Sequence, residues 1–224
     1  MSIIRKEKFV CPVCNAEGDY KVYRSVKVDL DKSLREKVLS QELFSWVCPN
    51  CGKELTVHYD FLYHDMTHAF MIYYSPNNCD EINDSINSQA EKFAGMRNSK
   101  YRTVDNFNQL IEKVLIFESG LDDITIELAK VLTKYNKENK VPEDCSLVFE
   151  KYLPNSKNND KSILLFRLLK KGEVQKEMIL LDIAGYREYE KTINTDERFK
   201  ETKYCDNINE TWILNRMSKK GTNN

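Results

Sequence analysis

The sequence predicts an α+β protein: a zinc-ribbon-like N-terminal domain with a helical insertion and an appended helical pair, then a small antiparallel β-rich C-terminal region. Three observations lead to this prediction. They are two Cys-Pro-x-Cys segments, two adjacent amphipathic helix patterns, and alternating strand patterns late in the chain. The polar segment 134–140 and the proline that follows it are typical of a linker. We therefore predict domains at residues 1–138 and 139–224.

Composition limits the classes of function. Of 224 residues, 41% are hydrophobic and 31% are charged, so we expect a packed core. The net charge of −1 argues against bulk binding to nucleic acid or to a membrane surface. No apolar run reaches the length of a signal or membrane-spanning segment, so we expect a cytoplasmic protein with no membrane partner. Seven cysteines in such a chain disfavour a disulfide framework.

Two six-residue segments share one pattern. VCPVCN supplies Cys11 and Cys14, VCPNCG supplies Cys48 and Cys51, and 33 residues separate the two pairs. A Cys-x-x-Cys turn presents two thiolates to one tetrahedral ion, and two such turns complete a four-sulfur shell. The sequence therefore predicts one structural Zn²⁺ per chain, held by these four cysteines.

The residues around the cysteines agree with this prediction. Pro12 and Pro49 fix the backbone φ angle and stiffen each turn. Asn15 and Gly52 follow the second cysteine of each pair, and both residue types tolerate the left-handed backbone that turns amides toward the sulfurs. The interval of 33 residues is longer than the common spacing, which indicates an inserted element between the turns.

Three alternatives to a closed structural site stay open. They are a disulfide, a thioredoxin-like redox pair, and a zinc site that responds to oxidation. A thioredoxin-like pair requires a helix after the cysteines, whereas the residues after Cys51 have a strand pattern. A closed four-cysteine shell has no open position for water or substrate, so we expect a scaffold and no catalytic residue.

The other elements follow from periodicity. Tyr, Phe and Val alternate in the strand segments, and apolar residues recur at helical offsets in the helix segments. Asp105 is the expected N-cap of the first helix of the pair, and Gly120 its end. Strands are predicted at 20–30, 55–65, 69–76, 145–154 and either side of a turn at 171–173, and helices at 31–46, 80–94, 107–119, 121–135 and 210–220.

Four separated pieces of the chain together resemble the CpXC domain, a bacterial and archaeal family named for its two C-P-x-C pairs. The pieces are CPVC, DKSLREKVLSQELFSWVCPNCG, FLYHDMTHAFMIYY and NFNQLIEKVLIFESGLDD, and they span roughly residues 8–132. The resemblance implies a metal-binding domain of uncharacterised biochemical function, with the four cysteines as ligands and no catalytic residues. Gln41 stands where the resemblance leads us to expect glycine, in the turn before ELF.

Histidines and carboxylates are weaker candidates. His64, Asp65 and His68 form an HDMTH segment similar to the helical zinc-protease motif. In a strand, residues i and i+4 lie about 13 Å apart, too far to share an ion. We therefore interpret this segment as a hydrogen-bonded turn or strand end. Glu118, Asp122 and Asp123 stand at the junction of two helices. Such carboxylates can serve in acid–base chemistry or bind Mg²⁺, but acidic side chains there also favour helix capping, which is the interpretation we adopt.

One segment is a candidate for contact with nucleic acid. Arg97, Lys100, Tyr101 and Arg102 interleave cations with an aromatic ring, although such a stretch is more often a solvated loop. The leading hypothesis is a non-enzymatic, zinc-stabilised interaction or scaffold module whose partner is another protein, contacted through the aromatic strands at 55–74. A nucleic-acid-binding zinc ribbon and a thiol-redox or metal-dependent enzyme are the alternatives. The sequence leaves the oligomeric state open.

Overall fold

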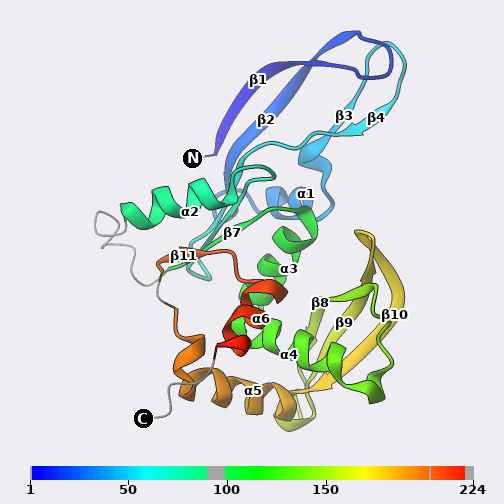
Figure 1. The fold of residues 1–224 in the computed structure, drawn as a ribbon. Helices are drawn as coiled ribbons and strands as arrows, with labels where there is room; N and C mark the ends of the chain where they lie inside the picture. The colour runs from blue at the N-terminus through cyan, green and yellow to red at the C-terminus, as the bar shows by residue number, and fades with distance from the viewer. Residues whose placement is uncertain (1, 90–98, 202, 220–224) are drawn as a thin grey trace. The chain divides into compact units, whose positions relative to one another are not determined.

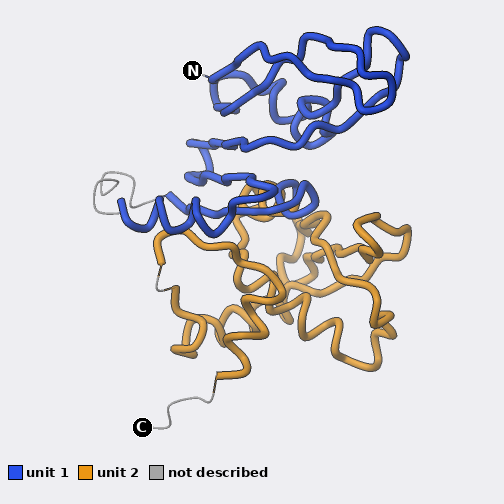
Figure 2. The backbone as a smooth tube through the Cα atoms, turned by 45° about the horizontal axis from the view of Figure 1, so that its top comes forward, with its two compact units in different colours: residues 1–111 blue, residues 112–224 orange. Residues whose placement is uncertain are grey.

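The computed structural model describes residues 2–89, 99–201 and 203–219 (Figure 1). It is a mixed α+β chain with several sheets, as the sequence predicts. The chain divides into two compact units, residues 1–111 and 112–224, which Figure 2 colours separately. No helix within the described ranges is both long enough and apolar enough to cross a membrane.

The division between the units falls within helix α3 (Phe107–Glu118), before the polar linker at which the sequence places a boundary, 138/139. Packing explains the difference. Helix α4 (Asp123–Tyr135) lies against α5 (Ile183–Thr195) and α6 (Glu210–Ser218) inside the second unit. The second helix of the predicted pair therefore belongs with the C-terminal region, because its apolar face is buried there.

The first unit is built around one sheet. Its elements are β1 (Ile3–Val10), β2 (Glu17–Lys27), α1 (Ser33–Leu39), the 3₁₀ helix η1 (Glu42–Phe44), β3 (Ser45–Val47), β4 (Glu54–Thr56), β5 (Phe61–Asp65), β6 (Phe70–Tyr74), α2 (Cys79–Ser88) and β7 (Lys100–Val104). The strand order within this unit is β1-β2-β5-β6-β7, with parallel pairs β2–β5 and β6–β7 and antiparallel pairs β1–β2 and β5–β6. Strands β3 and β4 form a separate antiparallel pair.

Aromatic side chains form the core of the first unit. Phe61 and Tyr74 are fully buried and pack their rings against Phe44, at centroid distances of 5.1 and 6.0 Å. Phe107 stacks on Tyr74 at 4.7 Å. The alternation in β5 and β6 therefore turns most of their aromatic rings into the core, whereas Tyr73 is only partly buried.

Two local differences from the predicted elements have simple causes. The predicted strand at 55–65 is divided into β4 and β5, because its first part pairs with β3 and its second part pairs with β6 in the larger sheet. No prediction covers β1, whose side chains are nearly all exposed, so it lacks the alternation of buried and exposed residues that marks a half-buried strand.

The turn after α1 adopts a backbone conformation that favours glycine. The Ser40 and Gln41 N–H groups donate to the Glu36 and Val38 carbonyls at 2.8 and 3.0 Å, which ends the helix. Gln41 then has φ 62° and ψ 10°, in the left-handed region. A glycine there has no Cβ to clash, so the glycine expected from the family resemblance has a physical reason.

We expect Gln41→Gly to stabilise the protein by about 0.5–1 kcal/mol, because relief of the left-handed strain exceeds the extra entropy of the unfolded chain. Urea unfolding measures the change. Gln89→Gly is the matched control, since Gln89 ends α2 at φ −108° and gains nothing from glycine. Equal or lower stability of Gln41→Gly would contradict the assigned backbone.

A carboxylate joins the end of β2 to the turn between β5 and β6. Asp29 accepts hydrogen bonds from the Met66 N–H at 2.8 Å, and from the Thr67 N–H and hydroxyl at 2.9 and 2.7 Å. Burial alone would raise the pKa of Asp29, but the bonds from Thr67 and Met66 outweigh it and hold the pKa at about 2. The ionised form is therefore the one that the folded turn favours.

Because the folded pKa lies below the unfolded value of about 3.9, this stabilisation is complete above that pH and disappears as the pH falls toward about 2. At neutral pH, Asp29→Asn should lower the free energy of unfolding by about 1–2 kcal/mol, after a discount for solvent screening.

Urea unfolding over a pH series measures the difference between the two proteins. Only the difference between the two proteins is compared, so that effects of acid common to both cancel. Asp19→Asn, which removes an exposed partner of Lys8, should change stability little. A difference that stays constant between pH 4 and pH 2 would exclude the depressed pKa of Asp29 as its source.

The second unit combines a small sheet with helices. Its elements after α3 are α4, the 3₁₀ helix η3 (Lys137–Asn139), β8 (Cys145–Leu153), the 3₁₀ helix η4 (Asn159–Lys161), β9 (Ile163–Lys170), β10 (Glu173–Asp182), α5, the 3₁₀ helix η5 (Glu197–Phe199), β11 (Cys205–Asp206) and α6. Strands β8, β9 and β10 form an antiparallel meander in the order β10-β9-β8, which confirms the predicted antiparallel strands of the C-terminal region.

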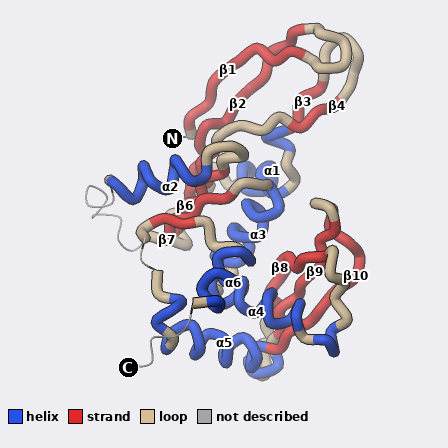
Figure 3. Tube along the Cα trace, in the orientation of Figure 1, coloured by secondary structure: helices blue, strands red, loops and turns tan. Residues whose placement is uncertain are grey.

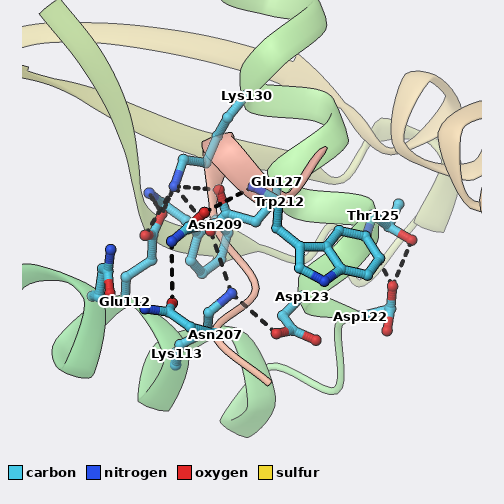
Figure 4. Close-up of polar contacts among 12 residues, drawn as sticks. Glu112, Lys113, Asp122, Asp123, Thr125, Glu127, Lys130, Asn207, Asn209 and Trp212 are labelled. Carbon is cyan, nitrogen blue, oxygen red and sulfur yellow. Dashed lines mark hydrogen bonds and ion pairs between the residues drawn. The ribbon is translucent and has the colours of Figure 1, made fainter. Parts of the chain in front are cut away.

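The helix pair α3–α4 is joined by buried charges (Figure 4). The Lys113 ammonium lies 3.0 Å from Asp123 and 3.3 Å from Glu127. The Lys130 ammonium lies 2.8 Å from Glu112 and 3.0 Å from Glu127. Both carboxylates raise the pKa of Lys130 above its usual value, although burial opposes them. A change that removes one partner would leave a buried charge unpaired, so this network fixes how the two helices pack.

Candidate metal centre

Each cysteine pair occupies a turn between two strands. In the first turn, the Cys11 N–H donates to the Ala16 carbonyl at 3.0 Å, and the Asn15 N–H donates to the Cys11 carbonyl at 2.8 Å. Asn15 has φ 57°, in the left-handed region. The predicted tolerance of asparagine for this conformation is therefore used, and the turn joins the end of β1 to the start of β2.

The second turn repeats the first at the same offsets. The Cys48 N–H donates to the Lys53 carbonyl at 2.9 Å, and the Gly52 N–H donates to the Cys48 carbonyl at 3.0 Å. Gly52 has φ 68°. The two turns thus have the same backbone hydrogen bonds, and each directs two thiols to one side of its hairpin.

The two turns bring the four thiols together. The Sγ atoms of Cys11, Cys14, Cys48 and Cys51 all lie within 4.8 Å of one another. Across the turns, the Cys11–Cys51 and Cys14–Cys48 sulfur distances are 3.8 and 3.5 Å. A tetrahedral ion with metal–sulfur bonds of about 2.3 Å requires sulfur–sulfur distances of about 3.8 Å. The donor type, number and spacing therefore fit a four-coordinate metal ion.

The four thiols differ in exposure and in acidity. Cys11 and Cys48 are buried, whereas Cys51 is exposed. A backbone hydrogen bond at Ala16, with help from Asn50, lowers the pKa of Cys14 to about 6. A backbone hydrogen bond at Lys53 lowers the pKa of Cys51, but partial desolvation and the neighbouring thiols outweigh it and raise the pKa to about 11. Without a metal, the cluster therefore favours one thiolate and disfavours several close together.

A small hydrophobic cluster supports the centre. Its buried members are Cys11, Tyr20, Val22, Trp46 and Cys48, and partly buried Phe9, Cys14, Ala16, Leu55, Val57 and Tyr59 pack against them. The Trp46 ring makes an edge contact with Phe9 at 5.0 Å, and its N–H donates to the Asp19 carbonyl at 3.1 Å. Trp46 thus joins the hairpin of the second turn to the hairpin of the first.

Gly18 allows this contact. A Cβ atom at Gly18 would lie 2.7 Å from the Trp46 ring and 2.9 Å from Pro49, which is closer than side-chain packing permits. The close approach of the two hairpins therefore requires the absence of a side chain at this position.

The histidines take no part in the centre. The His68 Nδ1 atom lies 2.7 Å from the Asp65 carboxylate, and the His68 N–H also donates to it at 3.0 Å, so HDMTH is a hydrogen-bonded turn. His58 hydrogen-bonds the Tyr74 hydroxyl at 2.6 Å and stacks on Phe107. Among the described residues, only the four cysteines form a cluster with metal-ligand spacing.

The candidate nucleic-acid segment lies largely inside the fold. Tyr101 and Arg102 belong to β7 and are 7% and 1% exposed, and Lys100 is partly exposed. Arg97 lies outside the described residues. A ring and a guanidinium at these depths do not stack on bases or contact phosphates, so the geometry is unfavourable to this hypothesis.

The sequence reasoning missed one group of polar residues, the buried network of α3 and α4. Periodicity did not indicate it, because Lys130 has mainly polar neighbours at i±3 and i±4, Glu127, Thr133 and Lys134, which is typical of a solvated helix face. Asp122 acts as the predicted cap and accepts from the Thr125 N–H at 2.8 Å. Its neighbour Asp123 instead joins the network.

The fold and the thiol cluster together define a module in which four cysteines from two hairpins could hold one metal ion. The family model of the CpXC protein matches residues 9–130, which is more than half of the chain. The chain belongs to the CpXC family, as the resemblance of its four pieces indicates. No curated protein and no solved structure matches it.

We expect Gly18→Ala to destabilise the first unit by about 1–3 kcal/mol, because the methyl group overpacks Trp46 and Pro49. Urea unfolding and Trp46 fluorescence are the measurements. Gly185→Ala, in the second unit, should leave the environment of Trp46 unchanged. Unchanged stability of Gly18→Ala would show that the two hairpins do not approach as described.

Proposed function

We propose that this CpXC protein is a non-enzymatic interaction or scaffold module whose N-terminal unit is stabilised by one structural Zn²⁺. The observation that carries the proposal is the spacing of the four sulfurs, all within 4.8 Å of one another. Two turns with the same backbone hydrogen bonds supply them, in a zinc-ribbon-like arrangement.

The donor set favours zinc over other common cations. Four thiolates in a tetrahedral arrangement suit zinc, whereas calcium and magnesium require oxygen ligands. Four protein ligands also close the shell, so such a site has no position for a reacting water or substrate. This is the reason for proposing a structural function and no reaction.

The binding free energy that a metal would supply is large compared with the stabilisation from the hydrophobic residues packed nearby. Structural zinc sites contribute on the order of 10–16 kcal/mol of apparent binding free energy at neutral pH. The hydrophobic cluster below the turns has only five buried members, two of which are cysteines of the site. Binding of zinc and folding of the hairpins should therefore be closely coupled.

The test is the metal content and stability of two matched variants. The protein as purified should contain one zinc per chain. Cys48→Ser should lose that metal and melt far below the parent protein, because it removes a ligand. Cys205→Ser should keep its metal, although the Cys205 side chain is as deeply buried as that of Cys48. Elemental analysis and thermal unfolding of the same samples measure both effects.

Two results would contradict the proposal. One is purified protein without metal that is fully folded. The other is equal melting temperatures for the Cys48 and Cys205 variants. Equal effects would mean that the loss of stability comes from replacing a buried thiol at either position, and not from loss of a metal ligand.

A second candidate function, thiol redox chemistry, is supported by the close approach of two thiols. The Sγ atoms of Cys14 and Cys48 lie 3.5 Å apart, and hydrogen bonds at Ala16 and Asn50 lower the pKa of Cys14. A thiolate is the form that attacks a disulfide. Metal-free protein that reduces a small disulfide at neutral pH, and loses this activity in Cys14→Ser, would favour this candidate over the structural one.

A further inference from the structure

Strand β9 has apolar side chains on both of its faces. Its sequence, ILLFRLLK, interrupts an apolar run only with Arg167 and the final lysine. Such a run is typical of a strand that is buried on both faces. A strand with one solvent-exposed face instead alternates apolar and polar residues. The sequence of β9 therefore indicates that something covers each face of its sheet.

The structure covers one face. Alternate residues of β8 and β9 are buried. Helix α4 packs against β8, and α5 contacts β10 (Figure 3). The largest of the buried residues, Phe149 and Phe166, are 1% and 0% exposed and meet edge to face at 5.9 Å. This inner face is the core of the meander.

The opposite face, which we call the outer face, is apolar and open. The strand registers place Leu165 beside Leu180, Leu169 beside Val174 and Ile163 beside Leu153. The exposed fractions are 59% for Leu180, 56% for Met178, 50% for Val174 and 38% for Leu153. Exposed apolar side chains that share one sheet face mark an interaction surface, whereas scattered ones need no explanation.

The charges of the outer face point to a second copy as its occupant. Arg167, in the middle, pairs with Glu150 at 2.5 Å and donates to the Lys176 carbonyl at 3.1 Å, so each copy compensates this charge itself. Lys151 lies on the edge strand β8, beside Leu165, and Asp182 lies on the other edge strand, β10, beside Ile163. Lys151 and Asp182 thus place opposite charges on the two edges, two residues apart along the strand direction, and the other outer-face charge of β8, Glu150, is already paired with Arg167.

We propose that the outer face is a homodimer interface, in which two β8–β9–β10 sheets pack face to face about a twofold axis parallel to the strands. This axis reverses the strand order in the second copy, so β8 of one copy faces β10 of the other. Each Lys151 then comes within reach of Asp182 of the second copy, and the leucines of the two faces meet in the middle. Stacked sheets of this kind pack about 10 Å apart.

The size of the face sets the strength of the dimer. Three strands about 4.8 Å apart and eight residues long cover about 14 by 26 Å, or roughly 400 Å² per copy. A stable interface buries about 800 Å² per partner. The dimer is therefore weak, and its population depends on protein concentration. It is independent of the proposed metal, which lies in the first unit.

Sedimentation velocity of the full chain tests the proposal. Between about 5 and 500 µM, the weight-average mass should rise from near 26.3 kDa toward twice that value. The double variant Met178→Lys/Leu180→Lys should weaken association more than tenfold, because it places two charges on each apolar face. Its melting temperature should not change, since both side chains are exposed in the single chain.

Two controls make the result specific. Leu30→Lys/Met66→Lys changes two side chains that are 71% and 65% exposed in the first unit, and it should dimerise as the parent protein does. Lys151→Glu should weaken association several-fold at low salt, because position 151 faces Asp182 of the second copy. Asp182 is not mutated, because its carboxylate caps helix α5.

Three results would overturn the proposal. They are a monomer mass at every concentration, undiminished association of the Met178/Leu180 variant, and equal loss of association in the Leu30/Met66 control. A monomer at every concentration would assign the outer face to a different partner.

Discussion

The first unit depends on the convergence of two cysteine turns that are far apart in the chain. Cys11 and Cys14 lie at the tip of the β1–β2 hairpin, and Cys48 and Cys51 at the tip of the β3–β4 hairpin. Strand β1 buries almost nothing, and β3 and β4 have three residues each. Such short or exposed hairpins are marginal alone. A shared metal shell, with Trp46 packed below it, is the interaction that would hold them in place.

The site and most elements could be predicted because their signals are local. A Cys-x-x-Cys turn needs only neighbouring residues, and Asn15 and Gly52 take up the left-handed conformation that their residue types permit. Helix α4 follows from apolar spacing and from the cap at Asp122. The meander at β8–β10 follows from long apolar runs around a turn, whose residues Lys171 and Gly172 both have positive φ.

The remaining features depend on tertiary packing, which periodicity does not reveal. Aromatic residues in β5 and β6 predict strands equally well whether their rings face a partner or a core. The contacts of Phe61 with Phe44 and of Tyr74 with Phe107 place these two rings in the core. The basic appearance of the segment around Arg102 does not show that its guanidinium is buried. The division of the chain within α3 depends on where α4 packs, and a polar linker after α4 is not evidence of a domain boundary.

The chain segment between the two cysteine turns can vary in length at little energetic cost. A metal bound by both turns would act as a reversible cross-link around a loop of 33 residues, and closing a loop of that size in the unfolded chain is worth about 4 kcal/mol. This entropy rises only with the logarithm of loop length, so doubling the loop would change it by about 0.6 kcal/mol. The segment that carries α1 can therefore lengthen or shorten with little effect on the cross-link, provided that both turns are kept.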